Sequence, residues 1–200
     1  AMWRIEADAD TIIEKTWMDG GGGIYQKGDN IFINLCRFTN IHRSGEAWAS
    51  AIHNGAHTGL FVTNFYIEDC DRGIEIEDGA KNVFVRNGVI IDVPDMAIDV
   101  HNHTTPCENV VYSHIYLVNC RGLRCADNGN RNKNVHYEYI ITENPSLYQN
   151  IFFADRGSIR HCRLGSKTSS EDYLLEVKGN NIVLFDVVIE EASGWGALYL

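Results

Sequence analysis

Short runs of alternating apolar and polar residues recur along almost the whole chain, and amphipathic-helix spacing is nearly absent. Many runs begin at Asn, as at residues 82–87, and a second run such as 89–92 follows. A third run, such as residues 73–79, completes the unit. Alternation sends every second side chain of a strand to the same side. The pattern therefore predicts an all-β chain with three short strands in each repeat.

An apolar position in the third run recurs at intervals of 21 to 28 residues, close to 24 on average. Its occurrences are Ile52, Ile76, Val100, Cys125, Phe153, Val177 and Leu198. A drifting period of this length is typical of a solenoid rather than a sandwich. The leucine and asparagine pattern of leucine-rich repeats is missing. We therefore expect about eight stacked turns of three parallel strands.

The repeat extends over residues 1–200, so a single domain is expected. Residues 1–28 are expected to form a cap or the first turn. Within them, residues 11–18 fit either a short helix or a degenerate turn, and the continuing repeat favours the turn. Residues 41–59 depart furthest from the period and are expected to leave the solenoid as a loop.

The repeats between about residues 30 and 191 resemble the right-handed parallel β-helix proteins of the pectate-lyase-like superfamily. The resemblance is carried by runs such as Asn-Val-Phe-Val-Arg-Asn at 82–87 and Gly-Ile-Glu-Ile-Glu-Asp-Gly at 73–79. It implies a right-handed β-helix and a polysaccharide ligand. Superfamily members include hydrolases, lyases, epimerases, phage tailspikes and inert scaffolds, so fold alone does not assign an activity. By this analogy an extracellular or virion-surface location is expected.

If Ile76 and Val100 point into the coil, their neighbours point outward and stack in columns from turn to turn. One predicted column contains Glu75, Asp99, Arg124 and Phe152; the other contains His53, Glu77, His101, Ala126 and Ala154. Two carboxyl groups on adjacent strands repel each other, which separates their pKa values. Glycosidic-bond hydrolysis uses such a pair. The predicted catalytic pair is therefore Glu75 and Asp99.

The remaining candidates would bind the substrate: Glu77, His101, Arg124, Phe152 and His53. An exposed ring of Phe152, Trp48, Trp195 or Tyr199 would favour stacking on sugars, as the resemblance implies, whereas buried rings would serve only packing. Solvated solenoid faces also carry charged residues without any function, and paired surface charges contribute little. The leading hypothesis is a protein that binds a polysaccharide along this face and hydrolyses it.

Two other classes stay open. One is a non-catalytic scaffold or adhesin, such as part of a phage or cell-surface fibre, for which a homotrimer or end-to-end contact between subunits is expected. The other is a Ca²⁺-assisted lyase or epimerase, which needs converging acids; the nearby candidates are Asp69, Asp71, Glu75 and Asp95. The Asn-Thr-Asp and Gly-His-Gly motifs of polygalacturonase-like hydrolases and the Arg-x-Pro-x-x-Arg segment of pectate lyases are absent.

Charge and cysteine content narrow the partners further. Asp and Glu outnumber Lys and Arg by 27 to 17, a net charge of −10, which disfavours nucleic acid and anionic membranes. No apolar run is long enough for a membrane span, and no signal peptide is visible. The six cysteines lack a C-x-x-C pair, so buried free thiols are expected. His101 and His103 alone do not complete a metal site, and no cofactor is predicted.

Overall fold

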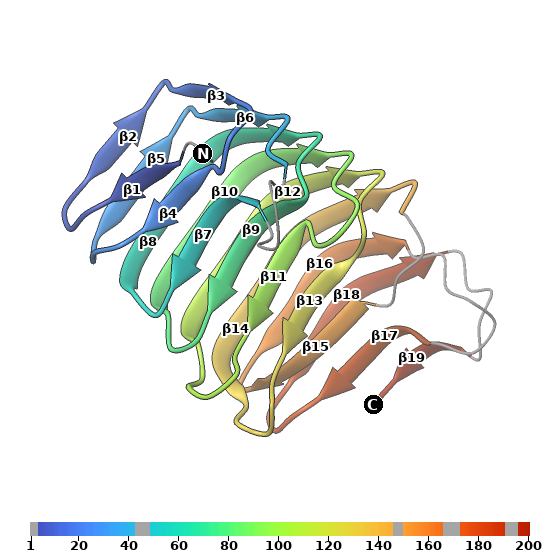
Figure 1. The fold of residues 1–200 in the computed structure, drawn as a ribbon. Helices are drawn as coiled ribbons and strands as arrows, with labels where there is room; N and C mark the ends of the chain where they lie inside the picture. The colour runs from blue at the N-terminus through green and yellow to red at the C-terminus, as the bar shows by residue number, and fades with distance from the viewer. Residues whose placement is uncertain (1–3, 43–48, 146–149, 166–172, 191–195) are drawn as a thin grey trace.

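A computed structural model of the chain describes residues 4–42, 49–145, 150–165, 173–190 and 196–200. These residues form a parallel β-solenoid whose turns stack along one axis, with N-terminal strands at one end and C-terminal strands at the other (Figure 1). All the regular elements described are strands. The all-β, parallel-solenoid prediction is therefore confirmed. The described residues include no helix with the length and hydrophobicity needed to cross a membrane.

The strands form two parallel stacks, which we call sheet A and sheet B. Sheet A contains β1 (Ile5–Ala7), β4 (Ile24–Gln26), β7 (Ser50–Gly55), β9 (Arg72–Glu77), β11 (Ile98–His101), β13 (Leu123–Ala126), β15 (Asn150–Asp155), β17 (Tyr173–Lys178) and β19 (Gly196–Tyr199). Sheet B contains β2 (Ile12–Glu14), β3 (Trp17–Asp19), β5 (Ile31–Asn34), β6 (Arg37–Thr39), β8 (Thr58–Glu68), β10 (Lys81–Ile91), β12 (Glu108–Val118), β14 (Asn132–Glu143), β16 (Ser158–Gly165) and β18 (Val183–Glu190).

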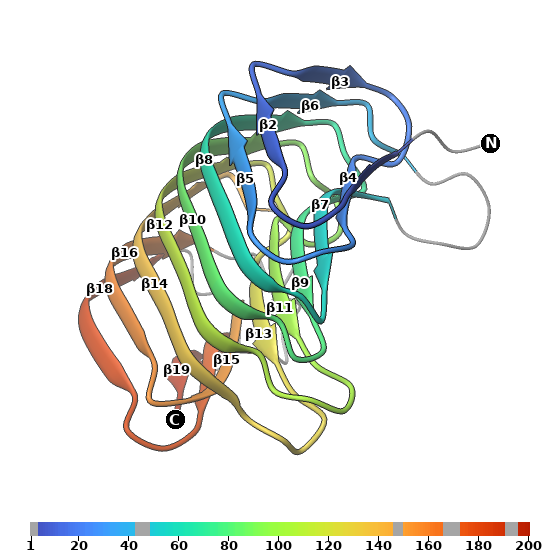
Figure 2. The ribbon, with the colours of Figure 1, turned by 90° about the vertical axis from the view of Figure 1, so that its left-hand side faces the viewer.

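The three predicted strands per turn are separate only near the N-terminus, in β1–β3 and β4–β6. In the six turns from β7 to β18, the first and second runs of the repeat join into one long, bent strand of sheet B, and the third run forms the separate strand of sheet A (Figure 2). The bends in β8 and β10 lie at Asn64 and Asn87, where φ is positive, and strand pairing skips both residues. Asn tolerates this left-handed conformation better than most residues. The three alternating runs of each repeat therefore correspond to three faces of the coil, and two of these faces belong to one bent strand.

The start of the chain and the predicted loop both contribute to the sheets. Residues 11–18 contain β2 and the start of β3, so the prediction of a turn of the solenoid rather than a helix is confirmed. The 41–59 segment does not leave the solenoid throughout, because it contains β7, which pairs with β4 and β9. Residues 43–48, including Trp48, lie outside the described residues.

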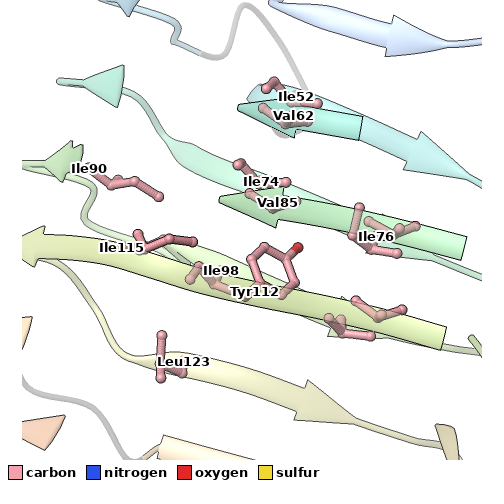
Figure 3. Packing of buried hydrophobic residues seen from close by; sticks show 14 of the residues in the cluster. Ile52, Val62, Ile74, Ile76, Val85, Ile90, Ile98, Tyr112, Ile115 and Leu123 are labelled. Carbon is pink, nitrogen blue, oxygen red and sulfur yellow. The ribbon is translucent and has the colours of Figure 1, made fainter. Parts of the chain in front are cut away.

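Equivalent apolar residues of successive turns pack in columns inside the coil. Ile52, Ile74, Ile98 and Leu123 pair in register along sheet A, and each is at most 1 % exposed (Figure 3). Tyr112 of sheet B packs edge-on against Tyr137 of the next turn. Each turn therefore buries its apolar side chains against its neighbours, as a solenoid requires.

All six cysteines are free and buried, which confirms the prediction for the thiols. Burial raises the pKa of the Cys70, Cys107 and Cys120 thiols to about 12. Because the thiolate is the nucleophile and the metal ligand, these thiols are unreactive at neutral pH. The cysteines thus belong to the packing of the coil.

One glycine sets the fit between two turns of sheet B. Gly88 pairs with Phe65, and a Cβ atom at Gly88 would lie 2.0 Å from the Phe65 ring. We expect Gly88→Ala to lower the free energy of unfolding by about 1–3 kcal/mol through overpacking. Urea denaturation measures this change. The Phe65→Leu substitution should recover part of the loss in the double variant, and strictly additive effects would contradict the proposed contact.

Candidate functional site

The register of β9, β11 and β13 aligns the predicted polar residues of sheet A. Glu75 lies opposite Asp99, which lies opposite Arg124. Glu77 lies opposite His101, one alternate position further along. The sequence pattern therefore placed these five residues correctly relative to one another.

His53 and Phe152 occupy other places than predicted. His53 lies opposite Glu75 rather than Glu77, because Ile52 pairs with Ile74. Its Nε2 atom still reaches a Glu77 carboxylate oxygen at 3.0 Å. His53 is thus still part of the site, because its side chain is long enough to reach Glu77 from the neighbouring position.

Phe152 points into the coil, where it is 0 % exposed and lies opposite Cys125. Its ring packs edge-on against Tyr137, with 5.3 Å between centroids. The prediction that Phe152 lies in the outward column is wrong, and Ile151 lies opposite Arg124 instead. Phe152 is a core residue and offers no surface for a sugar ring. Of the other aromatic candidates, Tyr199 is 42 % exposed, and Trp195 lies outside the described residues.

Asp99 is the centre of a buried ionic network. It is 0 % exposed, and Arg124 donates two hydrogen bonds to it, one of them from Nε at 2.6 Å. The Nδ1 atom of His101 lies 3.0 Å from the same carboxylate. Burial raises the pKa of Asp99, but the hydrogen bonds from His101 and Arg124 outweigh it and leave this pKa below its ordinary value. Asp99 is therefore a carboxylate at neutral pH.

His101 connects Asp99 to Glu77. Its Nε2 atom lies 2.8 Å from Oε1 of Glu77. Burial lowers the pKa of His101, yet hydrogen bonds to the two carboxylates raise it to about 9. The hydrogen bonds from His101 and His53 hold the pKa of Glu77 far below its ordinary value. At neutral pH, an imidazolium therefore lies between two carboxylates.

Glu75 lies on the other side of this network and is 3 % exposed. Ser50 and Arg72 donate hydrogen bonds to its carboxylate. Arg72 also contacts Asp95 through Nε at 2.6 Å. Burial raises the pKa of Glu75 above its ordinary value despite these partners. Glu75 and Asp99 of the predicted exposed column are thus buried, because Arg72 of the same strand and side chains of neighbouring turns cover them.

A pocket of about 410 Å³ opens beside the network, on the outer side of sheet A. Its lining includes Arg72, Glu77, His101, His103, Arg124 and Asn128. Neither Glu75 nor Asp99 lines it. The groups that a ligand meets first are therefore those predicted to bind substrate, whereas the predicted catalytic pair lies behind them.

Sequence reasoning assigned no role in the site to Ser50, Arg72 and Asn128. Ser50 lies opposite Arg72 across the β7–β9 pairing, which only the corrected register reveals. Asn128 follows β13 in a connecting segment, where strand alternation gives no information. His103 carried a usable signal, since it alternates with His101 along the chain.

The four candidate acids of the Ca²⁺-assisted alternative divide into two groups. Asp69 and Asp71 lie 3.4 and 3.1 Å from ring nitrogens of His42. Glu75 and Asp95 instead contact Arg72. Each acid therefore has a basic partner, and the two groups have different partners.

Comparisons with known proteins find no relative of this chain. No protein-family model, no curated protein and no solved structure matches it. A functional proposal therefore rests on the geometry of the described residues and on the pattern of the repeats, without support from a matching protein.

The protonation of His101 predicts a pH dependence of stability. The pKa is about 9 in the folded protein and about 6.5 for an ordinary histidine. The folded state binds this proton more tightly, so the stabilisation is complete below about pH 6.5 and is lost as the pH rises through about 9. We expect the free energy of unfolding to fall by up to about 3 kcal/mol over that range. Urea denaturation at a series of pH values, in buffer with a chelator, measures it.

The His101→Gln variant is the matched control for this measurement. Thiols and tyrosines titrate in both proteins at high pH, so the difference between wild type and variant isolates His101. That difference should shrink between pH 6.5 and 9. Parallel pH profiles would show that His101 does not hold the extra proton.

Proposed function

We propose that the protein binds a polysaccharide in the pocket on the outer side of sheet A. The observation that carries the proposal is a pocket whose charged lining is fixed from behind by buried hydrogen bonds. The ligand class is inferred from the resemblance of the repeats to the pectate-lyase-like superfamily. The proposal is that this chain, like members of that superfamily, binds a polysaccharide. The supporting chemistry is a lining that combines hydrogen-bond donors and acceptors.

Saccharide hydroxyl groups both donate and accept hydrogen bonds, so a complementary pocket needs both kinds of group. Arg124 supplies N–H donors, Glu77 supplies acceptors, and Asn128 supplies both. Asp99 holds the Arg124 guanidinium by two hydrogen bonds. A side chain held in this way loses little conformational entropy when a ligand binds.

The charge balance favours a neutral polysaccharide. The chain carries a net charge of −10, which repels a polyanion at long range. Within the pocket, Arg124 and Arg72 have buried carboxylate partners in Asp99 and Glu75. The pocket is therefore a mixed polar surface, and hydrogen bonds rather than net charge would select the ligand.

Hydrolysis is a second candidate, which one specific observation favours. Burial raises the pKa of Glu75, whereas Asp99 has a lowered pKa. Their carboxylates each offer an oxygen within 4.8 Å of the other. An acid and a carboxylate at short separation are the groups that a retaining glycosidase uses. A substrate would have to displace the covering side chains to reach them, and this burial favours a non-catalytic solenoid.

The binding proposal predicts that Glu77→Gln and Asn128→Ala each weaken polysaccharide affinity at least tenfold. Both substitutions remove a pocket group while keeping the buried Asp99–Arg124 pair. Affinity electrophoresis against a panel of neutral and acidic polysaccharides measures the effect. Glu143→Gln, an exposed substitution on sheet B, is the control and should bind like wild type. Equal binding by all four proteins would place the ligand elsewhere.

A catalytic Glu75–Asp99 pair predicts new reducing ends without the ultraviolet absorbance of unsaturated products. The Glu75→Gln, Asp99→Asn double variant should lose this turnover while circular dichroism shows it folded. Turnover retained in the folded variant would remove both residues from catalysis. Absorbance would indicate a lyase, and binding without turnover would leave binding as the function.

A further inference from the structure

Three side chains with metal-binding atoms meet at the pocket. They are Glu77, His101 and His103, and one ligand atom from each lies within 4.8 Å of the others. His101 and His103 alternate along the chain, and Glu77 comes from the preceding turn. Stacking of the turns thus places Glu77 beside the two histidines as a third metal-binding side chain.

The orientation of His101 suits a metal ligand. Its Nδ1 atom faces the buried carboxylate of Asp99 at 3.0 Å, and its Nε2 atom faces Glu77. Histidines that bind metals generally use one ring nitrogen for the ion and donate from the other to a carboxylate or carbonyl. Asp99 would hold the ring in this orientation.

The turn after β11 places His103 beside His101. Oδ1 of Asp78 accepts hydrogen bonds from the backbone N–H groups of His103 and Thr104, at 2.6 and 3.1 Å. The side chain of Asn102 is anchored to Asn132 at 2.8 Å. The backbone on both sides of His103 is therefore fixed, and its ring centroid lies 5.1 Å from that of His101.

A small divalent ion could be accommodated after small side-chain movements, in which His101 and Glu77 separate slightly and His103 turns toward them. Two ligand atoms bound about 2.0–2.1 Å from a tetrahedral ion lie about 3.3 Å apart. The Nε2 atom of His101 and Oε1 of Glu77 are 2.8 Å apart. The side chain of His103 is exposed and can rotate toward them. The pocket would leave a further coordination position open to solvent or ligand.

Access distinguishes this cluster from two others among the described residues, each of which shares one residue with it. Those clusters are His53–Glu75–Glu77 and Glu75–Asp99–His101, and both use Glu75. Ser50 and Arg72 already occupy the Glu75 carboxylate, which does not line the pocket. Once an ion displaces the proton of His101, the described network holds four carboxylates against three guanidinium groups, an excess of negative charge: Glu75, Glu77, Asp95 and Asp99 against Arg72, Arg121 and Arg124.

We propose that Glu77, His101 and His103 bind a divalent transition-metal ion, for which Zn²⁺ is the probe. Two imidazoles and one carboxylate suit ions of this class better than Ca²⁺ or Mg²⁺, which prefer oxygen ligands. This inference does not rest on saccharide binding, because the ion alone is the ligand. The open position would allow a bound ion to contact whatever occupies the pocket.

The test is titration of Zn²⁺ into tag-free, chelator-treated protein by isothermal calorimetry. We expect one ion per chain, and at least tenfold weaker binding by His103→Ala, a substitution of an exposed side chain outside the core. His114→Ala removes an exposed histidine of sheet B and should leave the affinity unchanged. No binding by wild type, or equal binding by all three proteins, would overturn the proposal.

Co²⁺ absorption provides a second readout, because the chain also contains six cysteines. Binding at the proposed site should give d–d bands without thiolate-to-cobalt charge-transfer bands. Strong charge-transfer bands would show that the ion binds cysteine and would contradict the assignment. Because neither experiment contains a saccharide, failure of the metal site leaves the saccharide proposal to its own test.

Discussion

Each turn of this solenoid can bury its apolar side chains only against the turns on either side of it. Parallel pairing satisfies this constraint by aligning equivalent residues about 4.8 Å apart. The same alignment acts on the outer face, where it brings Glu75 against Asp99 and Glu77 against His101. The ionic network is thus a consequence of core packing, because the register that buries Ile76 against Val100 fixes the outward neighbours as well.

Such a network is costly unless every charge has a partner. Taking a carboxylate out of water costs several kcal/mol, and pairing often does no more than compensate for it. Asp99 is fully buried and has Arg124 and His101 as partners, while Glu75 has Arg72 and Ser50. An apolar face of the same shape would be as stable or more so. The network is better explained by its positioning of the pocket residues Arg124 and His101 than by a contribution to stability.

The sequence predicted the register where the repeat is uninterrupted and failed where it is not. Ile76, Val100 and Cys125 follow one another at 24 and 25 residues, and their predicted alignment is confirmed. Ile52 precedes Ile74 by only 22 residues, which moved His53 by one alternate position. The longer connection between β13 and β15 shifted the next turn by one residue and moved Phe152 into the core. A one-residue shift of register moves every side chain of the strand to its opposite side, so even this small error exchanges core and surface residues.

The alternation pattern could not predict that part of the outer face is buried. Alternation distinguishes the two sides of a strand, and it does not show whether long side chains from other turns cover the outer one. Arg72 covers Glu75 from within its own strand, and Arg124 covers Asp99 from the next. Both arginines were visible in the sequence as charged residues, but their direction depends on contacts between turns. A charge column in a solenoid is therefore evidence of proximity, and its exposure must come from the structure.

The two outer faces show how the same stacking yields different chemistry. On sheet B, Phe61 and Phe84 stack with 5.3 Å between centroids, each 41 % exposed, and line a second pocket of about 390 Å³ with Phe32. That face offers the exposed rings predicted for Phe152, without the fixed charges of sheet A. A ligand that binds by stacking on aromatic rings would bind to sheet B, and one that binds through directed hydrogen bonds would bind to sheet A. Because Glu77 and Asn128 line only the pocket on sheet A among those described, their substitution separates the two modes of recognition.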